Sequence, residues 1–156
     1  MTKQKKNIVC IQGAGYVGAA MSIAVASKLD SNNIPIYDVY CIDLPTSEGK
    51  KRIDSINSGL FPFDIKDKNL SEELIKAKKK ENLIATSDTT HYSEANIVIV
   101  SINCDIDTSS GINVDFDSFK KSILTIAERI SENTLVIIES TVPPGTCKHI
   151  VYPIFV

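Results

Sequence analysis

The chain has 156 residues, of which 43% are hydrophobic and 23% charged, and its formal net charge at pH 7 is −2. This composition is typical of one globular domain with a sizeable core. The small net charge gives no whole-protein field toward nucleic acid or an anionic membrane, and no apolar run approaches the roughly 20 residues that span a bilayer. We therefore expect neither a nucleic-acid nor a membrane partner.

Strand-like and helical patterns alternate along the chain. Strands are predicted over 7–12, 36–43, 83–86, 95–102 and 135–140, and helices over 16–29, 47–58, 71–81 and 115–131. Residues 105–113 are rich in turn formers, and a last helix is predicted to begin at Pro144, whose fixed φ suits the first helical position. Alternation of this kind predicts an α/β fold, a doubly wound parallel sheet with helices on both faces.

Two features bear on the cellular context and the extent of the chain. The cysteines Cys10, Cys41, Cys104 and Cys147 lack Cys-x-x-Cys spacing, and no signal peptide is visible, so we expect reduced thiols in a cytoplasmic protein. The chain stops in the apolar stretch 151–156, which predicts a fragment of a larger protein, with residues 1–156 forming one domain. The alternative is a C-terminus that docks into its own core.

A glycine-rich turn follows the first predicted strand. Gly13, Gly15 and Gly18 fit the Gly-x-Gly-x-x-Gly pattern of dinucleotide-binding, Rossmann-type domains. In that pattern the first glycine permits a tight turn, the second lets a pyrophosphate approach the backbone, and the third lets the helix lie close to the sheet. The helix N-terminus then offers N–H groups to phosphate.

The second predicted strand ends in Asp43, near the spacing of about 20 residues expected for the acid that binds the adenine ribose. A carboxylate there accepts hydrogen bonds from the ribose hydroxyls and repels a 2′-phosphate, which favours NAD over NADP. Arg52 and the lysines before it offer cations to a 2′-phosphate, so the choice between the two cofactors stays open.

Two further strand ends are expected to border the cofactor, because ligands of open α/β sheets lie outside the carboxyl ends of the strands. One is the segment that contains Ile102, Asn103 and Cys104, and the other contains Ser140 and Thr141. The hydroxyls of Ser140 and Thr141 are predicted to face the nicotinamide half or to cap the following helix. His91 and His149 have no ligand-spaced partners, so we expect no metal site.

These motifs together resemble the UDP-glucose/GDP-mannose dehydrogenase family of nucleotide-sugar 6-dehydrogenases. The resemblance is carried by Gly13–Gly18, Asp43, the run 56–59 with Pro62, and the run Glu-Ser-Thr-Val-Pro-Pro-Gly-Thr at 139–146. It covers nearly the whole chain, but only the N-terminal cofactor-binding domain of the family. The branch that oxidises UDP-N-acetylated hexosamines looks slightly closer than the UDP-glucose branch.

The resemblance implies a protein that oxidises the C6 hydroxyl of a nucleotide sugar to a carboxylate in two steps with two NAD⁺, supplies uronic-acid sugars for surface polysaccharide, and forms a homodimer at full length. It implies that the catalytic cysteine lies beyond Val156, so that this chain alone is inactive. The implied cofactor-binding residues are Gly13, Ala14, Gly15, Tyr16, Val17, Gly18, Asp43, Arg52, Ser140 and Thr141. Thr141 also corresponds to the threonine that helps to hold a catalytic water.

The sequence departs from the family pattern at two places. Ile102–Ile106 replaces a loop with prolines and hydroxyls, so the resemblance does not specify the side-chain contacts there, while Ile102, Asn103 and Cys104 remain predicted cofactor-binding residues. About four more residues than usual separate Asp43 from Arg52, so the pattern alone does not place Arg52 at the ribose. A non-catalytic NAD(H)-sensing regulatory module, and an FAD- or methyl-donor-binding protein, remain as alternatives.

Overall fold

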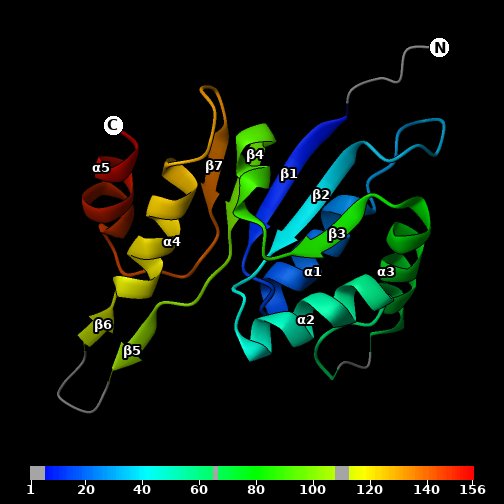
Figure 1. Cartoon of the computed structure of the whole chain (residues 1–156), viewed down its shortest axis with the longest axis horizontal. Helices are drawn as coiled ribbons and strands as arrows, with labels where there is room; N and C mark the ends of the chain where they lie inside the picture. Colours follow the sequence, from blue (N-terminus) through cyan, green and yellow to red (C-terminus); the bar gives the residue numbers. More distant parts are fainter. Residues whose placement is uncertain (1–5, 65–66, 108–112) are drawn as a thin grey trace.

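The computed structural model describes residues 6–64, 67–107 and 113–156. Within these residues, five parallel strands form one sheet in the order β3-β2-β1-β4-β7, and β5 and β6 form a separate antiparallel hairpin (Figure 1). The strands are β1 (Asn7–Gln12), β2 (Tyr37–Ile42), β3 (Leu83–Thr86), β4 (Ile97–Val100), β5 (Asp105–Asp107), β6 (Asn113–Asp115) and β7 (Leu135–Ile138). The helices are α1 (Tyr16–Ala26), α2 (Ser47–Ser58), α3 (Lys68–Lys80), the 3₁₀ helix η1 (Thr89–Glu94), α4 (Asp117–Ala127), the π-helical η2 (Cys147–Val151) and α5 (Tyr152–Phe155).

The sheet carries a hydrophobic core on each face, because successive side chains of a strand point to opposite sides. Val9 and Ile11 of β1 belong to the core that also contains residues of α1, α2 and α3. Cys10 of the same strand belongs to the other core, with residues of η1, α4 and η2. Helices thus cover both faces, and the predicted doubly wound α/β fold is confirmed (Figure 1).

The strand order places the functional end of the sheet. The chain runs outward from β1 through β2 to β3 and then returns to β4, on the opposite side of β1. The loops after β1 and β4 therefore leave the sheet in opposite directions from neighbouring strands. This is the point at which open α/β sheets bind their ligands.

Several predicted element bounds are confirmed, and the others differ for local reasons. The predicted bounds of β1, α2 and β3 match the structure. Helix α3 begins earlier than predicted, because the Asp67 carboxylate accepts hydrogen bonds from the N–H groups of Asn69 and Leu70 and caps it. Helix α1 ends at Ala26 rather than Leu29, because Leu29 forms an isolated bridge with Pro35.

The prediction that a helix begins at Pro144 is wrong. Pro143–Thr146 instead form a turn, in which the N–H of Thr146 donates to the carbonyl oxygen of Pro143 at 3.2 Å and Gly145 has a φ of +88°. Proline followed by a glycine of positive φ is the combination that a type II turn favours. The helical segment begins only after this turn, at η2.

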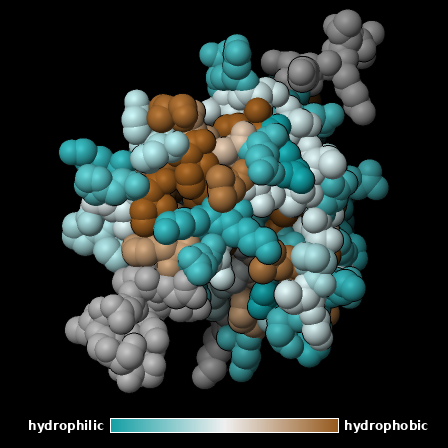
Figure 2. All heavy atoms as spheres, turned by 60° about the vertical axis from the view of Figure 1, so that its left-hand side comes forward, coloured by the Kyte–Doolittle hydropathy of each residue, from teal (hydrophilic) through white to brown (hydrophobic). Residues whose placement is uncertain are grey.

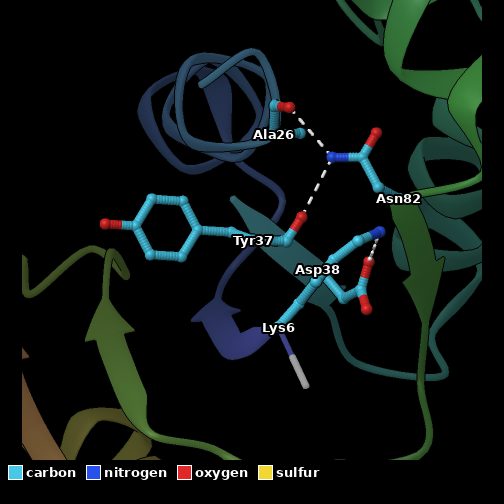
Figure 3. A network of polar contacts seen from close by, with 5 residues as sticks. All are labelled: Lys6, Ala26, Tyr37, Asp38 and Asn82. Atoms are coloured by element: carbon cyan, nitrogen blue, oxygen red, sulfur yellow. Dashed lines mark hydrogen bonds and ion pairs between the residues drawn. The ribbon is translucent and has the colours of Figure 1, made fainter. Parts of the chain in front are cut away.

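The opposite end of the sheet is held by a polar network (Figure 3). The buried Asn82 amide donates to the carbonyl oxygen of Ala26 at the end of α1 and to that of Tyr37 in β2, at 2.9 and 3.1 Å. Beside it, Lys6 and Asp38 form an ion pair of 2.8 Å. These contacts join α1 to β2 far from the carboxyl ends of the strands, so they serve the fold rather than the site.

Strand β7 forms one edge of the sheet and is apolar on both faces. On one face, Leu135 and Ile137 are 55% and 39% exposed. On the other, an apolar groove of about 460 Å³ is lined by Val136, Ile138, Cys147, Lys148, Val151, Tyr152 and Phe155. Figure 2, in which the side with α4 and α5 comes forward, shows hydrophobic residues gathered at the surface. The sheet thus ends in a strand with accessible apolar side chains.

Candidate functional site

The turn after β1 has the geometry that its glycines predict. Gly13 has a φ of +102° and donates its N–H to the carbonyl oxygen of Ile42 at 2.7 Å, and a Cβ on it would lie 2.4 Å from the carbonyl oxygen of Ser101. A Cβ on Gly18 would lie 1.9 Å from the carbonyl oxygen of Gly13. Both positions therefore exclude any side chain, since real Cβ atoms do not approach other atoms so closely.

Gly15 differs from these two glycines. A Cβ at this position meets no atom within 4 Å, so the backbone there faces open space. Gly15 is also the N-cap of α1, and it has no side chain to accept from the first N–H groups of the helix. The first turn contains no acidic residue. The turn thus presents N–H groups and a helix N-terminus to an anion that approaches over Gly15.

Asp43 and Arg52 meet at the end of β2. The Nε of Arg52 donates to the Oδ2 of Asp43 at 2.7 Å, and the N–H of Leu44 donates to its Oδ1 at 2.9 Å. Asp43 is only 8% exposed. The carboxylate is therefore held at the strand end with its two oxygens oriented by different partners.

The connection between Asp43 and Arg52 contains the N-terminus of α2. The hydroxyl of Thr46 accepts from the N–H of Gly49 at 3.0 Å and caps the helix. A Cβ on Gly49 would lie 1.9 Å from the carbonyl oxygen of Leu44, so the cap packs closely against the preceding turn. The helix then carries Arg52 back to Asp43, a pairing that the motif spacing did not predict.

A cavity of about 570 Å³ opens between the glycine turn and the ends of β4 and β7. Its lining residues are Gly15, Tyr16, Val17, Ser101, Ile102, Asn103, Cys104, Glu139, Ser140 and Thr141. The predicted nicotinamide-side residues Ile102, Asn103, Cys104, Ser140 and Thr141 are all brought together here. Ser101 and Glu139 also line the cavity, and both lie within the two strand ends that were expected to border the cofactor.

The hydroxyls of Ser140 and Thr141 are in different environments. The Ser140 Oγ accepts from the N–H of Ile102 at 2.9 Å and donates to the carbonyl oxygen of Val100 at 3.2 Å. Thr141 is exposed at the cavity. The Ser140 hydroxyl is therefore bonded to the backbone at the end of β4, a use that neither of the two predicted roles, facing the nicotinamide or capping a helix, described.

Three aromatic rings adjoin the glycine turn. Tyr16 lies with its ring centroid 5.5 Å from that of Phe61 and 5.8 Å from that of Phe63, and the two phenylalanine rings are 5.8 Å apart. Pro62, which carries part of the family resemblance, lies between these two phenylalanines. The contacts of Phe61 and Phe63 with Tyr16 hold the segment after α2 against the start of α1. The two phenylalanines were the sequence signal for this contact.

The cysteines differ in exposure, and none of the four forms a disulfide. Burial is the main cause that raises the pKa of the Cys10 thiol to about 12, and that of Cys41 likewise to about 12. Both are therefore protonated at neutral pH and are poor nucleophiles. Cys104 is partly buried at the cavity and Cys147 is exposed. Within the described residues, no group of three or more His, Cys, Asp or Glu side chains could hold a metal ion.

A parallel sheet of this order, with a glycine turn at its switch point and an acid at the end of β2, defines a dinucleotide-binding domain of the Rossmann type. The chain belongs to the UDP-glucose/GDP-mannose dehydrogenase family, whose NAD binding domain matches residues 6–156. Its cofactor is accordingly NAD. Within the described residues no helix is both long and apolar enough to cross a bilayer.

Relatives of known activity match the same part of the chain. UDP-glucose 6-dehydrogenase 4 of Oryza sativa subsp. japonica is 32% identical over 146 residues, which are 91% of this chain and 28% of that protein. UDP-N-acetyl-D-mannosamine dehydrogenase of Pyrococcus horikoshii is also 32% identical, over 140 residues that cover 90% of this chain and 30% of that protein. The chain thus spans under a third of these two relatives, and it is 32% identical to each of them.

Solved structures of nucleotide-sugar dehydrogenases share the fold. The NDP-N-acetyl-D-galactosaminuronic acid dehydrogenase of Methanosarcina mazei Go1 superposes with a TM-score of 0.84 at 22% identity, covering 96% of this chain and 30% of that one. The UDP-D-ManNAc dehydrogenase of Pyrococcus horikoshii gives a TM-score of 0.74 at 26% identity, covering 94% and 31%. The first of these likenesses shows the fold alone.

Proposed function

We propose that this chain is the cofactor-binding part of an NAD-dependent dehydrogenase that oxidises the C6 hydroxyl of a UDP-sugar to a carboxylate. The observation that supports this most directly is the Asp43–Arg52 pair beside the open backbone of Gly15. One feature is suited to a ribose and the other to a pyrophosphate, and they lie at the ends of adjacent strands. NAD⁺ supplies the hydride acceptor when it is bound.

In this proposal, different residues bind the adenosine half and the nicotinamide half of NAD⁺. The N–H groups at Gly15, Tyr16 and Val17 donate to the pyrophosphate, and the Asp43 carboxylate accepts from the hydroxyls of the adenine ribose. Arg52 holds that carboxylate in place through the Nε–Oδ2 contact of 2.7 Å. The nicotinamide half then enters the cavity between the ends of β4 and β7, where Ile102, Asn103, Cys104 and Thr141 line the wall.

A reaction of this kind needs a thiolate that captures the aldehyde. Burial keeps the thiols of Cys10 and Cys41 protonated, so neither is this nucleophile. Cys104 is a lining residue of the cofactor cavity, and Cys147 lies on the apolar groove beside β7. In this proposal Thr141 has an auxiliary role, holding a water at the nicotinamide side. The 156-residue chain binds NAD⁺ and does not turn over a nucleotide sugar.

The wider setting of the proposal is a cytoplasmic enzyme that acts as a homodimer at full length and supplies uronic-acid sugars for polysaccharide. Four cysteines without Cys-x-x-Cys spacing are typical of a reducing compartment. Which nucleotide sugar is oxidised depends on a pocket that this domain only borders.

Calorimetric titration of the purified chain with NAD⁺, FAD and S-adenosylmethionine tests the proposal. We expect binding of NAD⁺ alone, and no reduction of NAD⁺ when UDP-glucose or UDP-N-acetyl-D-mannosamine is added. Binding of FAD or S-adenosylmethionine in place of NAD⁺ would contradict the cofactor assignment. Oxidation of either sugar by this chain would show that the nucleophile lies within it.

A further inference from the structure

The two walls of the cofactor cavity come from strands whose pairing stops at the cavity edge. β4 and β7 pair in parallel from Ile97 with Leu135 up to Val100 with Ile138. Beyond that last pair, residues 101–104 and 139–141 both line the cavity, and we call these two segments its walls. The register of β4 and β7 does not extend to them, so contacts outside the strand pairing contribute to how the two walls lie relative to each other.

The Ser140 hydroxyl bridges the walls just past the last pair. It accepts from the N–H of Ile102 at 2.9 Å and donates to the carbonyl oxygen of Val100 at 3.2 Å. The same carbonyl oxygen accepts from the N–H groups of Glu139 and Ser140, each at 3.0 Å. The side chain thus continues, beyond the end of the sheet, the connection that the two strands make within it.

The wall held by Ser140 also touches the glycine turn. The N–H of Ser101 donates to the carbonyl oxygen of Gln12 at 2.9 Å. The carbonyl oxygen of Ser101 and the Cγ2 of Ile102 lie 2.4 and 2.8 Å from where a Cβ of Gly13 would be. Residues 101 and 102 are therefore confined between the turn on one side and Ser140 on the other. Loss of the Ser140 hydroxyl removes one of these two constraints.

We propose that Ser140 is a positioning residue for the nicotinamide half of the cofactor. Its hydroxyl holds the backbone at Ile102 against the end of β7, and so fixes how the two walls of the cavity lie relative to each other. The adenosine half is held elsewhere, by the turn at Gly15 and by the Asp43–Arg52 pair. This inference rests on the proposed function, because it assumes that the cavity receives the nicotinamide half of NAD⁺.

The test compares two ligands on three proteins. NAD⁺ and ADP share the adenosine and the pyrophosphate, but only NAD⁺ has the nicotinamide half. Calorimetry is done on the full 156-residue chain as wild type, Ser140→Ala and Ser140→Thr. We expect Ser140→Ala to raise the Kd for NAD⁺ about tenfold and the Kd for ADP less than about twofold, while Ser140→Thr, which keeps a hydroxyl, stays within about threefold for both.

A second measurement follows the hydrogen bond between the Ile102 N–H and the Ser140 hydroxyl. Hydrogen exchange of the Ile102 amide, measured by NMR, is expected to be at least about tenfold faster in Ser140→Ala than in wild type and in Ser140→Thr. Global exchange of the amides in β1 reports whether each variant is folded.

The outcomes separate this inference from the function on which it rests. Equal weakening of NAD⁺ and ADP in Ser140→Ala, or no weakening of either, would overturn the positioning role while leaving the cofactor assignment in place. Unchanged exchange at Ile102 would overturn it too. If the wild-type chain bound neither NAD⁺ nor ADP, the result would instead contradict the proposed function, and with it this inference.

Discussion

Arg52 reaches back from α2 to the carboxylate of Asp43, and the Nε–Oδ2 distance is 2.7 Å. Asp43 directly follows β2, whereas Arg52 lies within α2. Because Asp43 is almost fully buried, its carboxylate contacts protein partners, the Arg52 side chain and the N–H of Leu44, more than solvent. The pair therefore determines the electrostatics at the place where the adenine ribose is expected to bind.

Asp43→Asn is expected to change cofactor preference. The amide keeps an oxygen for the N–H of Leu44 but loses the charge that binds ribose hydroxyls and repels a 2′-phosphate, and it frees Arg52 to meet that phosphate. We expect the Kd for NAD⁺ to rise by about ten- to a hundredfold and the Kd for NADP⁺ to fall relative to it. Calorimetry with both cofactors measures the ratio.

Asp54→Asn is the matched control for this substitution. Asp54 lies in the same helix as Arg52 but is exposed, and neither cofactor's affinity is expected to change. An unchanged ratio of the two Kd values in Asp43→Asn would show that Asp43 does not discriminate at the 2′ position.

Gly15→Ala and Gly18→Ala are expected to have opposite effects. A methyl group on Gly15 enters open space and leaves the free energy of unfolding within about 0.5 kcal/mol of wild type, but it blocks the pyrophosphate and raises the Kd for NAD⁺ at least about tenfold. A methyl group on Gly18 collides with the carbonyl oxygen of Gly13 and lowers the free energy of unfolding by about 3 kcal/mol. Urea unfolding and NAD⁺ titration of both variants give the comparison, and normal NAD⁺ affinity in Gly15→Ala would place the pyrophosphate elsewhere.

Asn82→Ala is expected to lower stability without touching the site. It removes the two hydrogen bonds from the buried amide and leaves the carbonyl oxygens of Ala26 and Tyr37 without that donor (Figure 3). The free energy of unfolding should fall by about 1–3 kcal/mol, while the Kd for NAD⁺ of the folded protein is unchanged. Asn69→Ala, at an exposed position in α3, should lose nothing, and equal losses in the two variants would argue against the network.

The buried thiols predict a loss of stability at alkaline pH. Burial raises the pKa of Cys41 from 9.0 to about 12, so the folded state favours the protonated thiol. This contribution is fully present below pH 9 and is lost as pH rises from 9 toward 12, by up to about 1.4 kcal/mol per pH unit. Urea unfolding at pH 8, 9, 10 and 11 is expected to show a shallower decline for Cys41→Ala than for wild type. Parallel curves for the two proteins would mean that Cys41 ionises alike in both states.

The glycine turn and the bounds of β1 and α2 could be predicted from the sequence, because each depends on residues close together in the chain. The bounds of β1 and α2 follow from an apolar run closed by glycine and from a polar helix stopped by Gly59, whose φ is +81°. The Pro144 prediction failed because proline suits both a helix start and a turn. The glycine after it, which takes a φ of +88°, belongs to the turn.

The doubly wound fold, the glycine turn and the acid at the end of β2 were predictable from local sequence patterns, because alternating elements and glycine spacing act within one βαβ unit. The contact of Arg52 with Asp43, and the bonds of the Ser140 hydroxyl to the backbone at Ile102 and Val100, depend on long-range packing that these patterns do not encode. The first contact depends on the direction in which α2 leaves its capped turn. The second joins residues 38 and 40 positions apart, which become neighbours because β4 and β7 pair in parallel.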